Sequence, residues 1–219
     1  MGSLLGRIVG LLTGAAALSG PALGEPSARE TVLRFAERFL GAEAVARLSA
    51  PSPAAYESFA LLEVDADTTP YPDGLWGKLL LDEMLNHSDK AVWLDWRYNV
   101  LTLIDDDDWN DQLGAVFAQY GVPRPTPEER AEILALAAER HGARPEVMMF
   151  PALQPLAEVR GHRLMLFDND SDGLGLFMLP VGEASEWHLT HLGDVLIIDA
   201  AIGTVADPRR SGRMSVLAN

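Results

Sequence analysis

The stretch Arg163–Pro180 constrains the fold of this chain more than any other. Two apolar runs, Leu164–Phe167 and Leu174–Leu179, flank a short acidic loop, Asp168–Gly173, which reads DNDSDG. Apolar runs of strand length on either side of Asp, Asn and Gly are typical of a β-hairpin, because these residues favour turns. The sequence therefore predicts an antiparallel hairpin with three carboxylates at its tip.

Helices are predicted mainly in the N-terminal half and strands mainly in the C-terminal half. Ser27 and Glu30, and again Thr126 and Glu129, have the spacing of a capping box that begins a helix. Leu156–Val159 is predicted to be a strand that precedes the hairpin. The expected fold is α+β, with a mainly antiparallel sheet from the C-terminal half and helices packed on one face.

The segment Lys90–Arg97 reads KAVWLDWR and is apolar at both alternating sets of positions. This pattern predicts a central strand that is buried on both faces. Asp95 stands between Trp93 and Trp96, and a buried aspartate must be paired, hydrogen-bonded or shifted in pKa. Arg97 is the expected partner on the same face. Asp95, Trp96 and Arg97 are therefore candidate binding residues, and the alternative is a structural ion pair at the end of a strand.

The two ends of the chain lie outside the predicted single domain, residues 25–205. Residues 1–24 contain the apolar run Ile8–Leu18, which is shorter than the ~20 residues of a membrane-spanning helix. One interpretation is a secretory signal that is cleaved near Gly24, so that the protein is exported. The other, which we favour, is a retained leader on a cytoplasmic protein. Residues 206–219 have no core pattern and are predicted to be a disordered tail.

Charge is the strongest property of the composition. The chain has 32 acidic and 17 basic residues, a net charge of −15, and no cysteine. Nucleic acid and anionic membranes are therefore not expected partners, because they require clustered basic residues. A basic protein or a metal cation is permitted, and the alternative is that the charge serves only solubility. Over Ala54–Gln112, fourteen acidic residues accompany only Lys78, Lys90 and Arg97.

The loop at the hairpin tip matches the first half of a calcium-binding EF-hand loop. Asp168, Asp170 and Asp172 stand at alternate positions, and Gly173 follows them. Such carboxylates can turn inward on one hard cation. Leu179, however, occupies the position of the bidentate glutamate, and the flanks resemble strands. The alternative is a hairpin turn in which the same residues serve the backbone.

His188 and His191 are three residues apart on a predicted helix over Glu183–Leu192. Histidines at this spacing share a face and can bind zinc together with a third ligand. The alternative is a pair of partly buried or surface histidines. The sequence contains none of the nucleophile or phosphate-loop motifs of hydrolases and NTPases.

Two short motifs carry a resemblance to a family. The passage LLLDEMLNHSDKAVWLDWR, with Asp95-Trp96-Arg97 at its end, and the hairpin DNDSDG are similar to those of an uncharacterised bacterial family. That family tends to show Asp-Trp-Lys in the strand, and the similarity covers about Leu75–Ala200. The resemblance implies a small α+β domain and supplies no reaction. More remotely, the chain resembles bacterial toxin-immunity proteins in fold class.

The leading functional expectation is a non-catalytic binding protein that uses an acidic surface on a basic protein partner, as immunity proteins do. One alternative is a calcium-binding protein that uses the Asp168–Gly173 loop. Another is a hydrolase that uses Asp95, or the pair His188 and His191. Apart from calcium, no cofactor is expected, and neither nucleic acid nor integral membrane insertion is expected. The oligomeric state and the biological process are left open.

Overall fold

The computed structural model describes residues 26–61, 64–65, 70–95, 114–123, 125–139, 153–169 and 173–201. The predicted leader and tail lie outside these ranges, as do Trp96, Arg97, Asp170 and Asp172. The backbone of Asp95 belongs to a strand, but its side chain is outside the description.

The N-terminal half forms a group of helices. These are α1 (Ala28–Phe39), α2 (Ala42–Ser49), α3 (Ser58–Leu61), α4 (Asp73–Asp82) and the π-helical turn η1 (Glu83–His87). α1 begins as predicted, because the Ser27 hydroxyl accepts the Glu30 backbone N–H and the Glu30 carboxylate accepts the Ser27 backbone N–H. η1 follows α4 directly, so the helical rod continues through the junction of Asp82 and Glu83.

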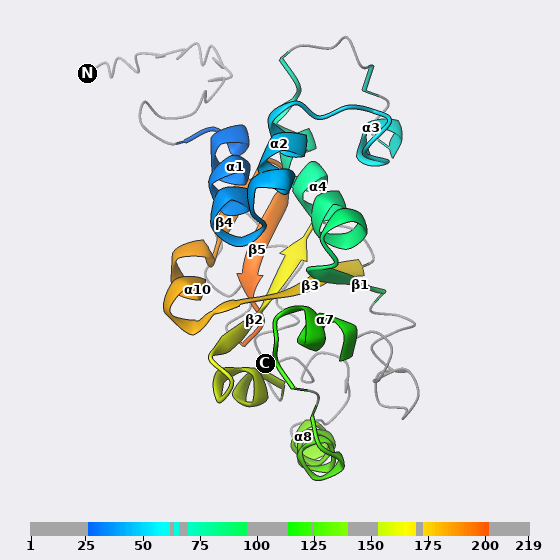
Figure 1. Cartoon of the computed structure of the whole chain (residues 1–219). Helices are drawn as coiled ribbons and strands as arrows, with labels where there is room; N and C mark the ends of the chain where they lie inside the picture. The colour runs from blue at the N-terminus through cyan, green and yellow to red at the C-terminus, as the bar shows by residue number, and fades with distance from the viewer. Residues whose placement is uncertain are drawn as a thin grey trace, which may run out of the picture.

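The predicted hairpin is confirmed, and its strands lie inside a five-stranded sheet. The order is β1-β3-β2-β5-β4, and every neighbouring pair is antiparallel (Figure 1). The strands are β1 (Ala91–Asp95), β2 (His162–Asp168), β3 (Gly173–Pro180), β4 (Thr190–Leu192) and β5 (Val195–Asp199). The α+β class and the antiparallel sheet of the C-terminal half are therefore confirmed.

Among the described strands β1 lies at the edge of the sheet, so the central position predicted for Lys90–Arg97 is not found there. The pattern is apolar on both faces because the sheet is covered on both sides even at this edge. Leu94 packs in the cluster on one face, and Ala91 packs in the cluster on the other. Trp93 lies against Gly173 of β3, where a Cβ atom would come within 2.5 Å of the indole ring.

The remaining described helices are α7 (Gly114–Gln119), α8 (Pro127–Glu139), residues 153–158 and α10 (Val181–Trp187). The second capping box is confirmed, because the Thr126 hydroxyl accepts the Glu129 backbone N–H and the Glu129 carboxylate accepts the Thr126 N–H. The strand predicted over Leu156–Val159 is wrong. Its first residues continue the helix at 153–158, and Val159 is 79% exposed in the turn that follows.

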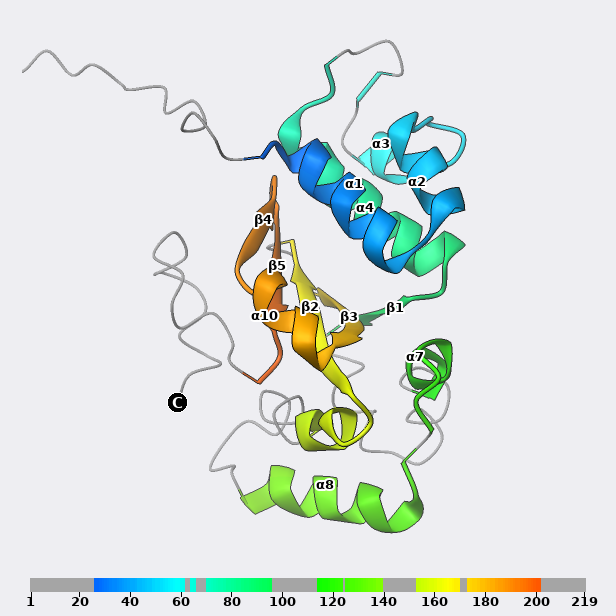
Figure 2. The same ribbon diagram turned by 60° about the vertical axis from the view of Figure 1, so that its left-hand side comes forward.

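Helices cover both faces of the sheet, so the expectation of packing on one face is incomplete. On one face Phe167 and Phe177 stack with ring centroids 4.2 Å apart, and Phe35 of α1 packs on both. On the other face Leu166 belongs to a cluster that includes Phe117 of α7. Figure 2 shows the two groups, α1 to α4 on one side of the sheet and α7 with α8 on the other.

Candidate functional site

The described ends of the candidate strand and of the hairpin lie side by side at one end of the sheet. The backbone of Asp95 pairs with Gly173, the last residue of the acidic loop. From the sequence, Asp95 and the acidic loop are predicted as two separate sites. The register of β1 on β3 places the backbone of Asp95 beside the end of that loop. Pairing of Asp95 with Arg97 stays a prediction, since both side chains lie outside the described part.

Asp168 ends β2 and is 3% exposed, while Gly173 begins β3. The carboxylate at the root of the predicted calcium loop is therefore buried inside the sheet rather than free on the surface. Asp170 and Asp172 lie outside the described residues, so the calcium interpretation stays a prediction. Within the described part, no group of three His, Asp or Glu side chains is arranged to hold a metal ion.

The structure contradicts the shared helical face of the two histidines. α10 ends at Trp187, Leu189 has a positive φ of 62°, and His191 lies in β4. His188 caps the end of α10, and its Nδ1 accepts the backbone N–H of Asp199 at 3.1 Å. The two histidines therefore belong to different elements, so the helical spacing predicted for a zinc pair is wrong, and the use of either histidine in hydrolysis stays a prediction.

Two of the acidic residues in Ala54–Gln112 are buried and cannot belong to an acidic surface. Glu83 is 0% exposed, and its carboxylate accepts two hydrogen bonds from Arg47, at 2.6 and 2.9 Å, and one from the Tyr56 hydroxyl at 2.8 Å. Asp82 is 7% exposed and accepts hydrogen bonds from Ser58 and from the Asn86 amide.

The hydrogen bonds of Glu83 with Arg47 and Tyr56, called here the Glu83 network, serve to stabilise the fold. Burial, followed by the hydrogen bond to Glu83, raises the pKa of Tyr56 far above its usual value, and the same carboxylate raises the pKa of Arg47. Both oxygens of Glu83 are occupied by these donors. A buried carboxylate that accepts three hydrogen bonds from its own chain is shielded from solvent and held in place, so we assign it to stability.

Most described arginines are neutralised inside the molecule. Arg38 pairs with Glu183, Arg47 with Glu83, Arg160 with Glu129, and Arg163 with both Glu158 and Asp199. These pairs remove positive charge from the surface.

Arg29 and Arg34 differ from those arginines, because each lies over a tryptophan ring. The guanidinium carbon of Arg29 is 5.5 Å from the centroid of Trp76, and that of Arg34 is 4.9 Å from the centroid of Trp187. Among the described residues, no carboxylate forms an ion pair with either of them.

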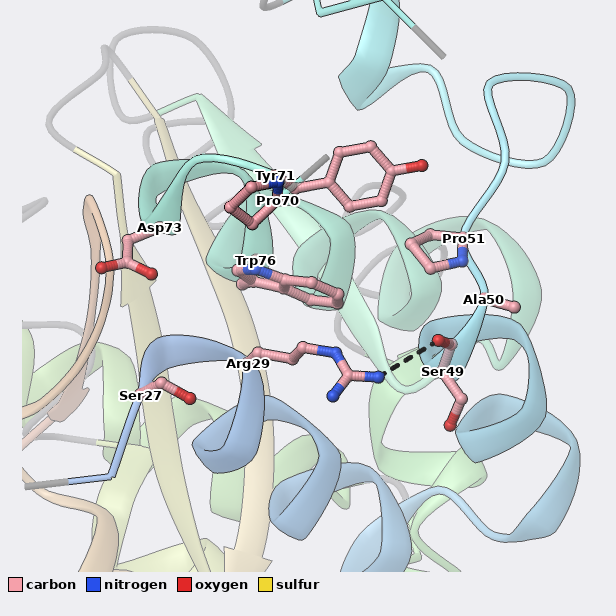
Figure 3. A pocket seen from close by; sticks show the side chains of 9 residues that line it. All are labelled: Ser27, Arg29, Ser49, Ala50, Pro51, Pro70, Tyr71, Asp73 and Trp76. Atoms are coloured by element: carbon pink, nitrogen blue, oxygen red, sulfur yellow. Dashed lines mark hydrogen bonds between the residues drawn. The ribbon is translucent and has the colours of Figure 1, made fainter. Parts of the chain in front are cut away.

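Arg29 and Trp76 also line a cavity of about 560 Å³. The cavity lies where the first turn of α1, the end of α2 and the loop before α4 come together (Figure 3). Its other lining residues are Ser27, Ser49, Ala50, Pro51, Pro70, Tyr71 and Asp73. Cavities of this size are typical of small-molecule sites. The combination of a cation, two aromatic rings and a carboxylate makes this cavity a candidate site for a small ligand.

Sequence reasoning misses this site. Arg29 reads as one of several polar residues in the first turn of α1, and Trp76 reads as one of the core residues of α4. The available signal is the concentration of proline and aromatic residues in Pro70–Trp76, where a plain connecting loop would be polar. The contact between this segment and α1 is long-range and leaves no local pattern.

Comparison with protein-family models, curated proteins and solved structures gives no match for this chain. The resemblance of the strand and hairpin motifs to a bacterial family therefore stays a prediction. No helix in the described ranges is long and apolar enough to cross a membrane.

Proposed function

We propose that this protein is a binding protein whose negatively charged surface engages a basic protein partner. The observation that carries the proposal is that many described arginines are paired within the chain, whereas many described carboxylates are exposed to solvent. Four of the described arginines are held in ion pairs by carboxylates of the same chain. Carboxylates, in contrast, are exposed on both sides of the sheet, at Glu37, Glu43, Glu57, Asp65, Asp73, Asp89, Glu128, Glu132, Glu186 and Asp194.

A surface of this kind favours a basic partner through long-range attraction. The chain has a net charge of −15, and in its described part Arg38, Arg47, Arg160 and Arg163 are already held in ion pairs. Such a surface speeds encounter with a positive partner and suppresses binding to acidic ones. Salt screens exposed charges over ~10 Å at 0.1 M, so the interaction should weaken steeply with ionic strength.

The experiment is capture of partners on the immobilised full chain at low salt, followed by identification and purification of each captured protein. The proposal expects a basic protein whose affinity falls about tenfold or more between 50 and 500 mM NaCl. The affinity for this partner should also fall when three exposed acids of the stretch Ala54–Gln112 are neutralised, by Glu57→Gln, Asp65→Asn and Asp89→Asn. The proposal fails if the captured proteins are neutral or acidic, or if salt leaves their affinity unchanged.

A matched control removes the same amount of charge elsewhere. The triple variant Glu128→Gln, Glu132→Gln and Glu186→Gln neutralises three exposed acids outside the acidic stretch. If the partner binds the stretch 54–112, this control should change affinity much less than the first triple variant. Equal losses would place the interaction on the net charge of the molecule and not on one surface.

A calcium site at Asp168–Gly173 is a second proposal, based on the three carboxylates at alternate positions of the DNDSDG loop. Calcium at about 100 times its Kd should stabilise the chain by ~2.7 kcal/mol relative to EDTA. The variant Asp170→Asn with Asp172→Asn should abolish that shift. An unchanged melting temperature in millimolar calcium would exclude the site.

A further inference from the structure

We propose that the cavity between α1 and α4 is a binding site for a small carboxylate that carries a flat apolar body. The carboxylate is held by Arg29, and the flat body lies against Tyr71 and Trp76. This site is separate from the acidic surface and does not depend on a basic protein partner.

The first argument is the state of Arg29. It is exposed, and its guanidinium donates one long hydrogen bond of 3.4 Å to the Ser49 carbonyl oxygen. Its remaining N–H groups make no further hydrogen bond to the described residues. In a chain with 32 acidic residues, a cation at the wall of a cavity that forms no ion pair with a described carboxylate is unusual. The planar fork of arginine matches the two oxygens of a carboxylate.

The second argument is that the orientation of Arg29 is fixed before a ligand arrives. Its guanidinium lies over Trp76, which is itself 5% exposed and therefore held by the core. The bond to Ser49 at the end of α2 restrains the other side of the group. Figure 3 shows the side chain running along the Trp76 ring toward Ser49. A side chain already held in place loses less entropy when it binds.

The third argument concerns the rest of the wall. Tyr71 and Trp76 meet edge to face with centroids 6.1 Å apart, and Pro51 and Pro70 continue the apolar lining. Flat rings of this kind favour a flat aromatic ligand. Asp73 lies at the opposite end of the cavity from the Arg29 guanidinium (Figure 3), so a hydrogen-bond donor on the far edge of the ligand would face it.

The local field selects a single negative charge. The first turns of α1 and α4 both border the cavity and contribute the positive ends of their dipoles. The surrounding protein is strongly negative, and Asp73 is part of the lining. Each further negative charge on a ligand therefore adds repulsion, so a monoanionic carboxylate fits better than a phosphate dianion.

The test uses three probes that share one ring and differ in charge: indole-3-acetate, indole-3-acetamide and tryptamine. Binding to the full chain is followed by ligand-observed NMR. A fragment of this size should bind with a Kd of ~1 mM. The proposal expects the acetate to bind about tenfold more tightly than the neutral amide, and the cationic amine to bind most weakly. Tightest binding of tryptamine, or no binding of any probe at ~10 mM, would overturn it.

Two arginine variants locate the effect. Arg29→Ala should reduce acetate binding to the level of the amide and leave amide binding unchanged. Arg34→Ala is the matched control, because Arg34 is also on α1 and also lies over a tryptophan, Trp187 of α10, but does not line the cavity. Equal loss with both variants would assign the effect to net charge and refute the site. Melting curves of both variants confirm folding, and the probe series on the unaltered chain remains decisive if Arg29→Ala is unstable.

Discussion

Replacement of members of the Glu83 network should destabilise the protein in a defined order. Glu83 is 0% exposed, whereas the side chain of its partner Arg47 is 34% exposed. Arg47→Ala therefore leaves a buried carboxylate with Tyr56 as its main donor, while Glu83→Gln leaves a guanidinium that can turn to water. The expected order of destabilisation is Arg47→Ala, then Glu83→Gln, then Tyr56→Phe.

The magnitudes follow from the same exposures. Loss of one partner of a buried ion pair costs about 3–5 kcal/mol when the other is left buried, which is the case of Arg47→Ala. For Glu83→Gln we take about half of this, ~2 kcal/mol, because Arg47 can be hydrated and the amide still accepts the Tyr56 hydroxyl. Tyr56→Phe removes one hydrogen bond while Arg47 still holds the carboxylate, and should cost ~1 kcal/mol.

The assay is urea denaturation at pH 7, with thermal melting as a second measurement. At this chain length ~2 kcal/mol corresponds to a fall of about 6 °C in Tm. Glu37→Gln is the control, because Glu37 is exposed on α1 and should change stability by less than ~0.5 kcal/mol. A Glu83→Gln variant as stable as the control, or more stable than Tyr56→Phe, would show that the network does not hold the fold together.

Two further predictions concern packing and pH. Gly77→Ala should destabilise the protein by ~1–3 kcal/mol, because a Cβ atom at this position would meet the Leu192 carbonyl oxygen. Gly182→Ala in α10 has open space around the new Cβ atom and should stabilise the protein by ~0.5–1 kcal/mol. Equal urea midpoints for the two variants would contradict this packing. Burial lowers the pKa of His188, so the folded state prefers the neutral ring that accepts the Asp199 N–H. Stability should therefore fall as pH decreases through about 6.5, and a His188→Gln variant with an unchanged pH dependence of Tm would contradict the assignment.

Local signals in the sequence predict local structure well. Asp168–Gly173 between two apolar runs predicts the hairpin, and the pairs Ser27 with Glu30 and Thr126 with Glu129 predict the helix starts that the structure has. In each case the residues that form the feature are close in the chain. Their hydrogen bonds are made within a few residues, so tertiary context has little power to override them.

The failures arise where distant parts of the chain decide the outcome. Trp93 and Leu94 are shielded by helices on both faces, so β1 looks central although it lies at an edge. Leu153 and Leu156 are three residues apart and are both buried on one side of a helix. The short apolar run that begins at Leu156 looks like a strand when it is read without Leu153. Leu189 adopts a positive φ, although such a conformation is usually signalled by a glycine in the sequence. The chain therefore leaves the helix before His191.

The cavity is the part of the candidate site that sequence reasoning could not reach. Arg29 and Trp76 belong to different helices, and only their packing creates the wall between them. The acidic character, in contrast, is visible at once in the composition. What composition does not reveal is that Asp82 and Glu83 are used internally, so part of the charge that the sequence assigns to the surface belongs to the core.

The arrangement of the sheet has a consequence for the biogenesis of the protein. Phe35 of α1 packs on Phe167, Phe177 and Trp187, so these contacts of α1 cannot form until the ribosome has made most of the chain. β5, which pairs with β2, is translated later still. The nascent N-terminal helices can pack on one another, but the side of α1 that faces the sheet stays uncovered until then, and a cellular chaperone could bind there.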